Sequence, residues 1–155
     1  MSRTIPVNGK FTPRQRQVYD AVLRLLNAGM AMLRPGITNE KWHAEVCRLM
    51  ERELLGLGLI SRTEIENQDA SSPAFFRYYM HGTGHFLGLD VHDVGSRQDV
   101  FKKGMVMTCE PGIYIPEEGI GIRLENDVMV DDVPVNLMAH IPVDPDEIEE
   151  LMGRR

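Results

Sequence analysis

A change of periodicity near the middle of the chain constrains its fold most. Residues 13–33 and 38–56 carry apolar side chains at helical spacing, whereas 101–114 and 119–130 are rich in Val, Ile, Met and Tyr with Gly and Pro between them. Two helices followed by several strands is the order of an α+β domain, not of alternating βαβ units. We therefore predict two helices, packed as an antiparallel pair, on an antiparallel sheet.

Local signals set the bounds of the two helices. Thr12 is suited to cap the first one, with Pro13 at the first helical position and Gln15 closing a capping box. Residues 34–36, Arg-Pro-Gly, end that helix. The second helix begins after Thr38 and ends at the glycines that follow position 55.

The remaining segments carry weaker signals. Residues 61–75 are polar and predict an irregular loop. Near the end, Asp144 to Glu147 form another capping signature, which predicts a short terminal helix up to about Met152.

Charge and size exclude several classes of protein. The 155 residues suffice for one domain. Lys and Arg number 17 against 23 Asp and Glu, a net charge of −6, which argues against a nucleic-acid partner. No apolar stretch is long enough for a membrane span, and the first residues do not form a secretory signal. With only two cysteines, Cys47 and Cys109, we expect a soluble protein of a reducing, cytoplasmic compartment.

The densest functional signal is the segment from His81 to Gly95. It holds His81, His85 and His92, three of the five histidines of the chain, among several glycines. Gly82 and Gly84 predict a loop or strand whose backbone passes close to another group, rather than a helix. The alternative is a Gly-rich turn with histidines on the surface.

Two acidic segments follow the histidines. Glu110 ends an apolar run, and a carboxylate at the end of a buried strand needs a partner. Strand alternation places Arg123, Glu125 and Asp127 on one face. That second segment alone fits a half-solvated strand equally well.

Together, these histidines and glutamates predict a site of nitrogen and oxygen ligands. Such a donor set suits Mn, Fe, Co or Zn. The sequence lacks H-E-x-x-H, C-x-x-C, a P-loop and G-x-S-x-G. Cys109 is expected to be a packed strand residue and not a nucleophile.

The motifs resemble one known family in several blocks and in the right order. Residues 81–95, then Glu110 to Tyr114, then Gly121 to Asp127 resemble the aminopeptidase P (Xaa-Pro aminopeptidase) branch of the pita-bread metallopeptidases. Residues 3–12 match the same branch. The resemblance implies a partial pita-bread fold over residues 1–155, as the C-terminal portion of a catalytic domain.

The resemblance also implies a ligand set and an activity. The family binds two metal ions, usually manganese, through two Asp, one His and two Glu. It removes the N-terminal residue from peptides whose second residue is proline. The matching metal ligands are His85, Glu110 and Glu125. His81 and His92 match histidines that line the cleft, with Glu110 also the acid/base, and Tyr114 and Arg123 support the ligands.

The family's two metal-binding aspartates lie before the match to Arg3. We therefore expect this chain to lack the first half of the domain, to bind one ion or none, with Co, Zn or Fe as alternatives to Mn, and to have reduced or no activity. Partner chains of the same sequence would cover the exposed sheet. The alternatives are a non-catalytic module that binds a peptide or a metal, and a remnant whose fold survives without a role.

Overall fold

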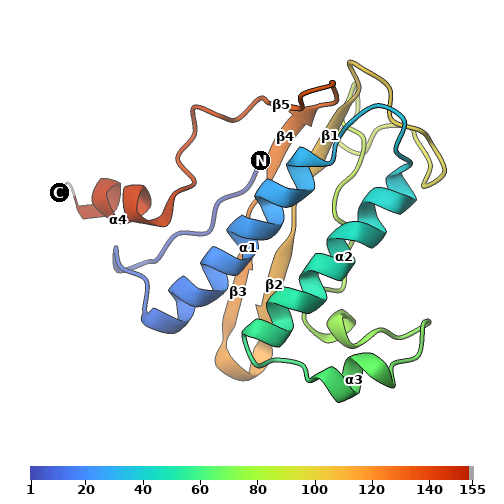
Figure 1. The fold of residues 1–155 in the computed structure, drawn as a ribbon. Helices are drawn as coiled ribbons and strands as arrows, with labels where there is room; N and C mark the ends of the chain where they lie inside the picture. The colour runs from blue at the N-terminus through green and yellow to red at the C-terminus, as the bar shows by residue number, and fades with distance from the viewer. Residues whose placement is uncertain (154–155) are drawn as a thin grey trace.

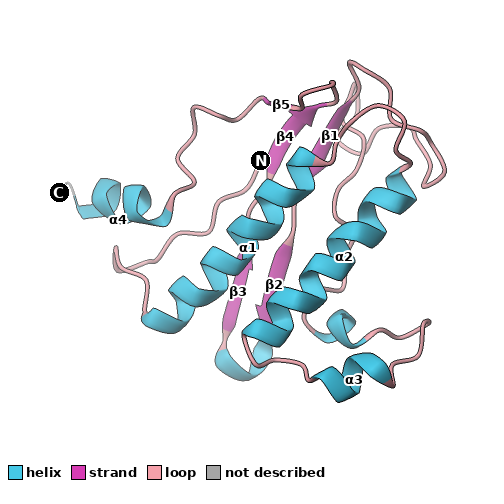
Figure 2. Cartoon of the chain, viewed as in Figure 1, coloured by secondary structure: helices cyan, strands magenta, loops and turns pink. Residues whose placement is uncertain are grey.

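The computed structural model describes residues 1–153, and its architecture is the predicted α+β (Figure 1). Helices α1 (Pro13–Ala31) and α2 (Asn39–Gly56) run antiparallel, side by side, across one face of the strands. The short helix α3 (Arg62–Glu66) lies beyond the end of α2, and α4 (Pro145–Gly153) lies beside the start of α1. Figure 2 shows that long loops connect the helical and the stranded parts.

The strands form two short antiparallel sheets. The first has the order β1-β4-β5 and the second pairs β2 with β3. Their bounds are β1 Val106–Cys109, β2 Gly112–Ile115, β3 Ile120–Arg123, β4 Asn126–Met129 and β5 Val135–Asn136.

The two sheets are halves of one interrupted hairpin. Cys109 pairs with Asn126 at the end of one sheet, and Gly112 pairs with Arg123 at the start of the other. Between them, the backbone N–H of Leu124 donates to the carbonyl of Pro111 at 3.3 Å. The interruption therefore falls where the sequence places Glu110 and Glu125.

The predicted helix starts are confirmed. Thr12 accepts a hydrogen bond from the backbone of Gln15, whose side chain accepts one from Thr12 in return. Thr38 caps α2 with its hydroxyl, which accepts a hydrogen bond from the backbone N–H of Lys41. At the start of α4, the Asp144 carboxylate accepts from the backbone N–H groups of the next turn. These bonds satisfy donors that a helix start otherwise leaves free.

Two expectations about local structure were wrong. Residues 61–75 are not irregular throughout, because they contain α3 and a 3-10 turn at Ala74–Arg77. A second capping box, between Ser61 and Glu64, stabilises α3 although none of its side chains is buried. The strand predicted from residue 101 begins only at Val106, because Gly104 turns the chain with φ +88°.

The core lies between the two long helices and the strands. The helices contribute a fully buried stripe at the predicted spacing, and the strands contribute the facing side chains, which include Val18, Val22, Leu25, Leu26, Trp42, Val46, Met50, Leu54, Met107, Cys109, Ile113, Leu124 and Val128. Each large side chain buried in this way contributes about 1.5–3 kcal/mol. The prediction that Cys109 is a packed strand residue is confirmed, since its side chain is fully buried.

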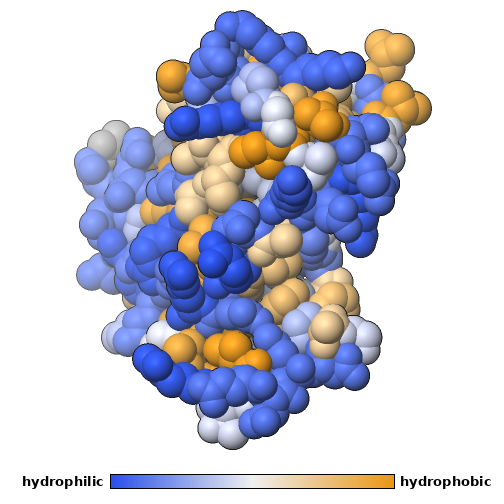
Figure 3. Space-filling model, turned by 45° about the vertical axis from the view of Figure 1, so that its right-hand side comes forward, coloured by the Kyte–Doolittle hydropathy of each residue, from blue (hydrophilic) through white to orange (hydrophobic). Residues whose placement is uncertain are grey.

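The surface is mainly polar on the face drawn in Figure 3, with separate apolar patches. The most exposed large apolar side chains include Leu89, Val91 and Val94, in the loop after the His81–His85 segment, and Val7. None of the helices in residues 1–153 combines the length and the hydropathy needed to cross a bilayer.

Candidate functional site

The predicted site residues gather at the interruption of the hairpin. Residues 83–86 run along β1, because the carbonyls of Thr83 and His85 accept hydrogen bonds from the backbone N–H groups of Glu110 and Thr108 at 2.8 and 2.9 Å. On the other side, Ser2 pairs with Glu125 through two backbone hydrogen bonds. Four backbone segments therefore lie next to one another at the interruption: residues 83–86, β1, the segment at Glu125 and the segment at Ser2.

Gly84 explains how the histidine segment comes so close to β1. A Cβ atom at this position would lie 1.9 Å from the carbonyl oxygen of Thr108 and 3.0 Å from the ring of Trp42. The backbone therefore requires glycine here, and the prediction that this segment passes close to another group is confirmed. The segment is extended rather than helical, as predicted.

His81 is held by both ring nitrogens. Its Nδ1 lies 2.8 Å from the carbonyl oxygen of Gly82, and its Nε2 lies 2.9 Å from the hydroxyl of Tyr114. A carbonyl can only accept, so Nδ1 carries the proton and Nε2 accepts from the Tyr114 hydroxyl. Burial raises the pKa of Tyr114, which keeps its hydroxyl protonated as a donor.

His85 has the same tautomer and faces a carboxylate. Its Nδ1 donates to the carbonyl of Phe86 at 2.9 Å, so the lone pair of Nε2 points to Glu110 Oε1, 3.7 Å away. His92 stacks on His85, with ring centroids 4.0 Å apart and planes 11° from parallel. In the neutral ring, the Nε2 acceptor therefore faces a carboxylate oxygen, an arrangement that a cation between them would stabilise.

Arg123 links the two glutamates. Its guanidinium lies 3.3 Å from Glu110 Oε2 and 3.5 Å from Glu125 Oε2. It also donates to the hydroxyl of Ser2 at 2.7 Å. The partly buried strand-end carboxylate of Glu110 thus has the partner that its position requires, and Arg123 and Glu125 lie on one face, as alternation predicts.

Glu125 is the most enclosed of these carboxylates. It accepts hydrogen bonds from the Met1 amino group at 3.2 Å and from the Ser2 hydroxyl. Burial alone would raise the pKa of Glu125, but these two donors and Arg123 lower it on balance. The neighbouring Asp127 Oδ1 is buried and accepts no hydrogen bond in residues 1–153, although the Met1 nitrogen lies 3.7 Å away.

The three predicted ligands suit a divalent metal ion only in part. The free Nε2 of His85 beside Glu110 Oε1 fits a cation that prefers nitrogen and oxygen ligands. Glu125 does not join them, because its oxygens are engaged by Ser2, Met1 and Arg123. Across the described residues, no three His, Cys, Asp or Glu side chains are gathered as a metal site. The chemistry fits at two of the three predicted ligands, and the arrangement of the third does not.

Sequence reasoning missed several side chains that support this site. Thr108 Oγ1 accepts from the His85 backbone N–H at 2.9 Å and lies 3.3 Å from Glu110 Oε1. Ser2 bridges Arg123 and Glu125. Thr108 stands two residues before Glu110, so strand alternation could have placed both on one face. No sequence signal marks Ser2, whose role depends on pairing across more than 120 positions.

Comparisons with known proteins give consistent matches. The model of metallopeptidase family M24 matches residues 1–132. The chain is 42% identical to Xaa-Pro aminopeptidase of Escherichia coli (strain K12), over 98% of this chain and 37% of that protein. It is 37% identical to Xaa-Pro aminopeptidase 3 of Homo sapiens, over 99% of this chain and 32% of that protein. The chain thus spans about a third of the length of these relatives.

Solved structures agree with the sequence matches. Proline aminopeptidase P II from Yersinia pestis superimposes with a TM-score of 0.85 at 42% identity, over 97% of this chain and 37% of that one. Zn-substituted E. coli aminopeptidase P in complex with product gives a TM-score of 0.84 over the same shares. These matches confirm the predicted resemblance and the expectation of a partial pita-bread fold.

Proposed function

Because this chain belongs to metallopeptidase family M24, we propose that it serves metal-dependent hydrolysis of peptides with proline in the second position. The family implies a divalent metal. The named relatives are Xaa-Pro aminopeptidases, which supports this substrate class. On this proposal, residues 1–155 form the C-terminal portion of the catalytic domain.

His85 and Glu110 would hold a single ion, with Glu125 as the third ligand once it exchanges its present hydrogen bonds. Manganese is the first choice, and Co, Zn and Fe suit the same donors. When bound, such an ion polarises a peptide carbonyl and lowers the pKa of a coordinated water. We expect one weakly bound ion, because Glu125 is engaged by Arg123, Ser2 and Met1.

The other side chains would position the peptide and move protons. His81 and His92 would line the cleft, with His92 placed against the peptide carbonyl. Glu110 would take a proton from the attacking water and deliver it to the leaving amine. Arg123 would balance the charge of the two glutamates, and Tyr114 would keep the ring of His81 oriented.

One observation carries this proposal. The Nε2 lone pair of His85 faces Glu110 Oε1 at 3.7 Å, while Nδ1 is tied to a backbone carbonyl. A histidine that ligates a metal through one nitrogen commonly donates its other N–H to such an acceptor. The orientation of this ring supports the proposal that His85 is a ligand of the site.

The test measures cleavage of an Xaa-Pro-Xaa tripeptide by the purified chain with added Mn²⁺, with a chelator in a parallel sample. We expect slow cleavage that the chelator abolishes. We also expect His85→Ala to abolish Mn²⁺ binding in calorimetry, whereas His140→Ala, at an exposed position, leaves it unchanged. Equal Mn²⁺ binding by His85→Ala would contradict the ligand assignment, and cleavage that resists the chelator would contradict the metal mechanism.

A second function follows from the position of Arg123. Its guanidinium lies between the two glutamates, where it competes with a cation for their oxygens. This supports a non-catalytic module that binds a peptide rather than a metal. Binding of an Xaa-Pro peptide without cleavage, by folded protein supplied with Mn²⁺, would favour this alternative over the peptidase.

We further propose that copies of the chain associate in the cytoplasm. The exposed Leu89, Val91 and Val94 offer an apolar surface near the site, and two buried free cysteines fit a reducing compartment. Light scattering at micromolar concentration should give a mass above that of one chain. A monomer throughout this range would overturn the association.

A further inference from the structure

A buried hydrogen-bonded group lies behind the histidine segment, on the side away from the glutamates. Thr83, which is 1% exposed, points from this segment toward α2. Its hydroxyl lies 2.8 Å from His43 Nδ1 and 2.9 Å from the Tyr79 hydroxyl. We call His43, Thr83 and Tyr79 the rear cluster.

The protonation of the rear cluster is well defined. Burial lowers the pKa of His43, and the nearby charge of Arg97 lowers it further, so its ring is neutral at pH 7. Burial keeps Tyr79 protonated as well, because it raises the pKa of its hydroxyl. A hydroxyl donates once and accepts twice, so Thr83 can bond both neighbours at once. Thr83 therefore bonds both neighbours, while the Nε2 of His43 lies 3.5 Å from the thiol sulfur of Cys47.

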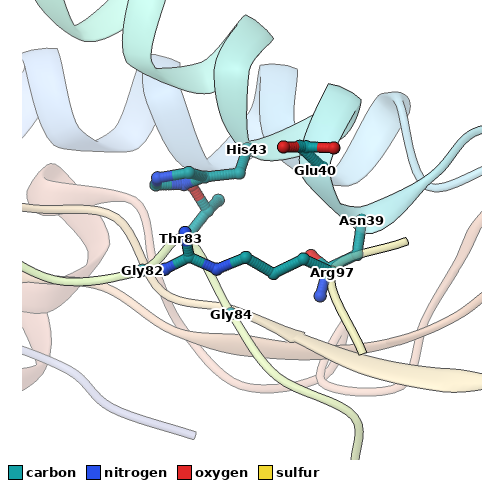
Figure 4. A pocket seen from close by; sticks show the side chains of 7 residues that line it. All are labelled: Asn39, Glu40, His43, Gly82, Thr83, Gly84 and Arg97. Carbon is teal, nitrogen blue, oxygen red and sulfur yellow. The ribbon is translucent and has the colours of Figure 1, made fainter. Parts of the chain in front are cut away.

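A cavity of about 120 Å³ adjoins the rear cluster. In Figure 4, His43 projects from α2 beside Thr83, and the side chain of Arg97 extends along the opposite wall. Because this space lies next to His43, an amide side chain can replace its imidazole without steric conflict.

The rear cluster is connected to the site by short paths. The carbonyl of Thr83 accepts from the backbone N–H of Glu110 at 2.8 Å. The ring of Tyr79 packs edge-on against the ring of His81, with centroids 4.9 Å apart. One residue beyond Gly84, His85 turns its Nε2 toward Glu110. Movement of Thr83 would therefore shift both imidazoles and the backbone of Glu110.

We propose that His43 is a positioning residue for this site. Through Thr83 and Tyr79 it fixes residues 81–85 so that His81 and His85 keep their Nδ1–H tautomers and direct Nε2 toward Tyr114 and Glu110. The structural part of this inference concerns the chain without metal. Only its consequence for metal affinity rests on the proposed function.

The test follows the ring nitrogens of the five histidines by NMR of ¹⁵N-histidine-labelled protein without metal. We expect wild type to show fixed Nδ1–H signals for His81 and His85. His43→Leu and Thr83→Val should lose this pattern and show averaged tautomers, while His43→Asn, which can still bond Thr83, should restore it. A role in stability alone would lower the melting temperature but leave the tautomers of the folded protein unchanged.

The control is His140→Leu, which removes an exposed histidine and should leave both ring patterns unchanged. If His43→Leu does not fold, Thr83→Val decides, with Thr83→Ser as its conservative partner. Wild-type tautomers in folded His43→Leu and Thr83→Val would overturn the proposal.

A second readout separates this inference from the proposed function. Calorimetry with Mn²⁺ should show about tenfold weaker binding by Thr83→Val than by wild type, the size of effect that supporting residues have on metal affinity. Failure of wild type to bind Mn²⁺, together with the expected tautomer changes, would refute the metal site and leave the positioning role supported. Unchanged affinity of Thr83→Val, where wild type does bind, would overturn the consequence for the metal.

Discussion

The two sides of the histidine segment are built from different chemistry. The side toward α2 is closed, with Thr83 buried and Gly84 pressed against Trp42 and the backbone of Thr108. The opposite side carries His85 and a series of partly accessible ionic groups. One side is therefore held by shape and neutral hydrogen bonds, and the other by charges.

This difference predicts stability effects of different size on the two sides of the segment. Close packing responds to a single added or lost carbon, because the surrounding backbone cannot move away. Ion pairs with exposed partners respond weakly, because water replaces much of what is lost. Substitutions on the closed side should therefore cost more folding stability than substitutions on the open side.

The largest effect is expected for Gly84→Ala. The added Cβ would lie 1.9 Å from the carbonyl oxygen of Thr108, which is backbone and cannot move without breaking the pairing along β1. We expect a loss of about 4 kcal/mol or more in the free energy of unfolding. Urea unfolding followed by circular dichroism measures it.

Gly82→Ala is the matched control. A Cβ there would have only the carbonyl oxygen of Gly84 near it, at 4.0 Å. Its unfolding free energy should stay within about 0.5 kcal/mol of wild type. Equal losses in the two variants would show that the closed side is not packed as described.

The next effect is expected for Trp42→Leu. Trp42 is 1% exposed and donates from Nε1 to the carbonyl of Gly29 at 2.9 Å. The substitution leaves a cavity and an unpaired buried carbonyl, so we expect a loss of about 3 kcal/mol in urea unfolding. Leu89→Ala, in the fully exposed loop, should change stability by less than about 0.5 kcal/mol. A loss below about 1 kcal/mol for Trp42→Leu would refute the rigid closed side.

The closed side was the more predictable one from sequence. Helical spacing identified the stripe that includes Trp42, and the capping residues fixed the helix starts because both signals are local. The segment 61–75 was misread, since α3 depends on a capping box and not on an apolar stripe. The glycine pattern correctly predicted a close backbone approach at Gly84, although periodicity could not identify the group it meets.

The open side could be predicted only in part. Three residues now found together stood out for different reasons: His85 for its Gly-rich histidine segment, Glu110 as an acid at a strand end, and Arg123 for strand alternation. Their order in space could not be derived, because it depends on the interruption of the hairpin. His43 escaped notice because a single helical histidine is usually a core residue, and its partner Thr83 is 40 positions away.

A smaller effect is expected for Arg123→Met on the open side. The arginine side chain is 42% exposed, so solvent screens its attraction to both glutamates. We expect a loss of about 1 kcal/mol at low ionic strength that shrinks as salt is added. Arg48→Met breaks the exposed ion pair with Glu45 within α2. Its loss in the free energy of unfolding should be only a few tenths of that of Arg123→Met. A loss above about 3 kcal/mol that salt does not reduce would show that Arg123 stabilises the fold by close packing, as residues of the closed side do.

The last prediction concerns the pH dependence of folding stability, which the neutral hydrogen bonds of the closed side should make sensitive to acid. Burial lowers the pKa of His43 below its ordinary 6.5, and the charges of Arg97 and His81 lower it further, while the neutral Cys47 and Tyr79 also face its ring. As pH falls below about 6.5, the unfolded chain takes up a proton on His43 that the folded chain does not yet accept. Folding stability therefore decreases with acidification, by at most about 1.4 kcal/mol per pH unit for this one group.

His43→Asn removes the titrating group and keeps a side chain able to bond Thr83. Its unfolding free energy, measured by urea titration between pH 7 and 5, should therefore fall less steeply with acid than that of wild type. His140→Asn removes an exposed histidine and should keep the wild-type slope. If His43→Asn also kept that slope, His43 would have to be as accessible to protons as a surface histidine. The closed side would then be open to water at a residue that links α2 to the histidine segment.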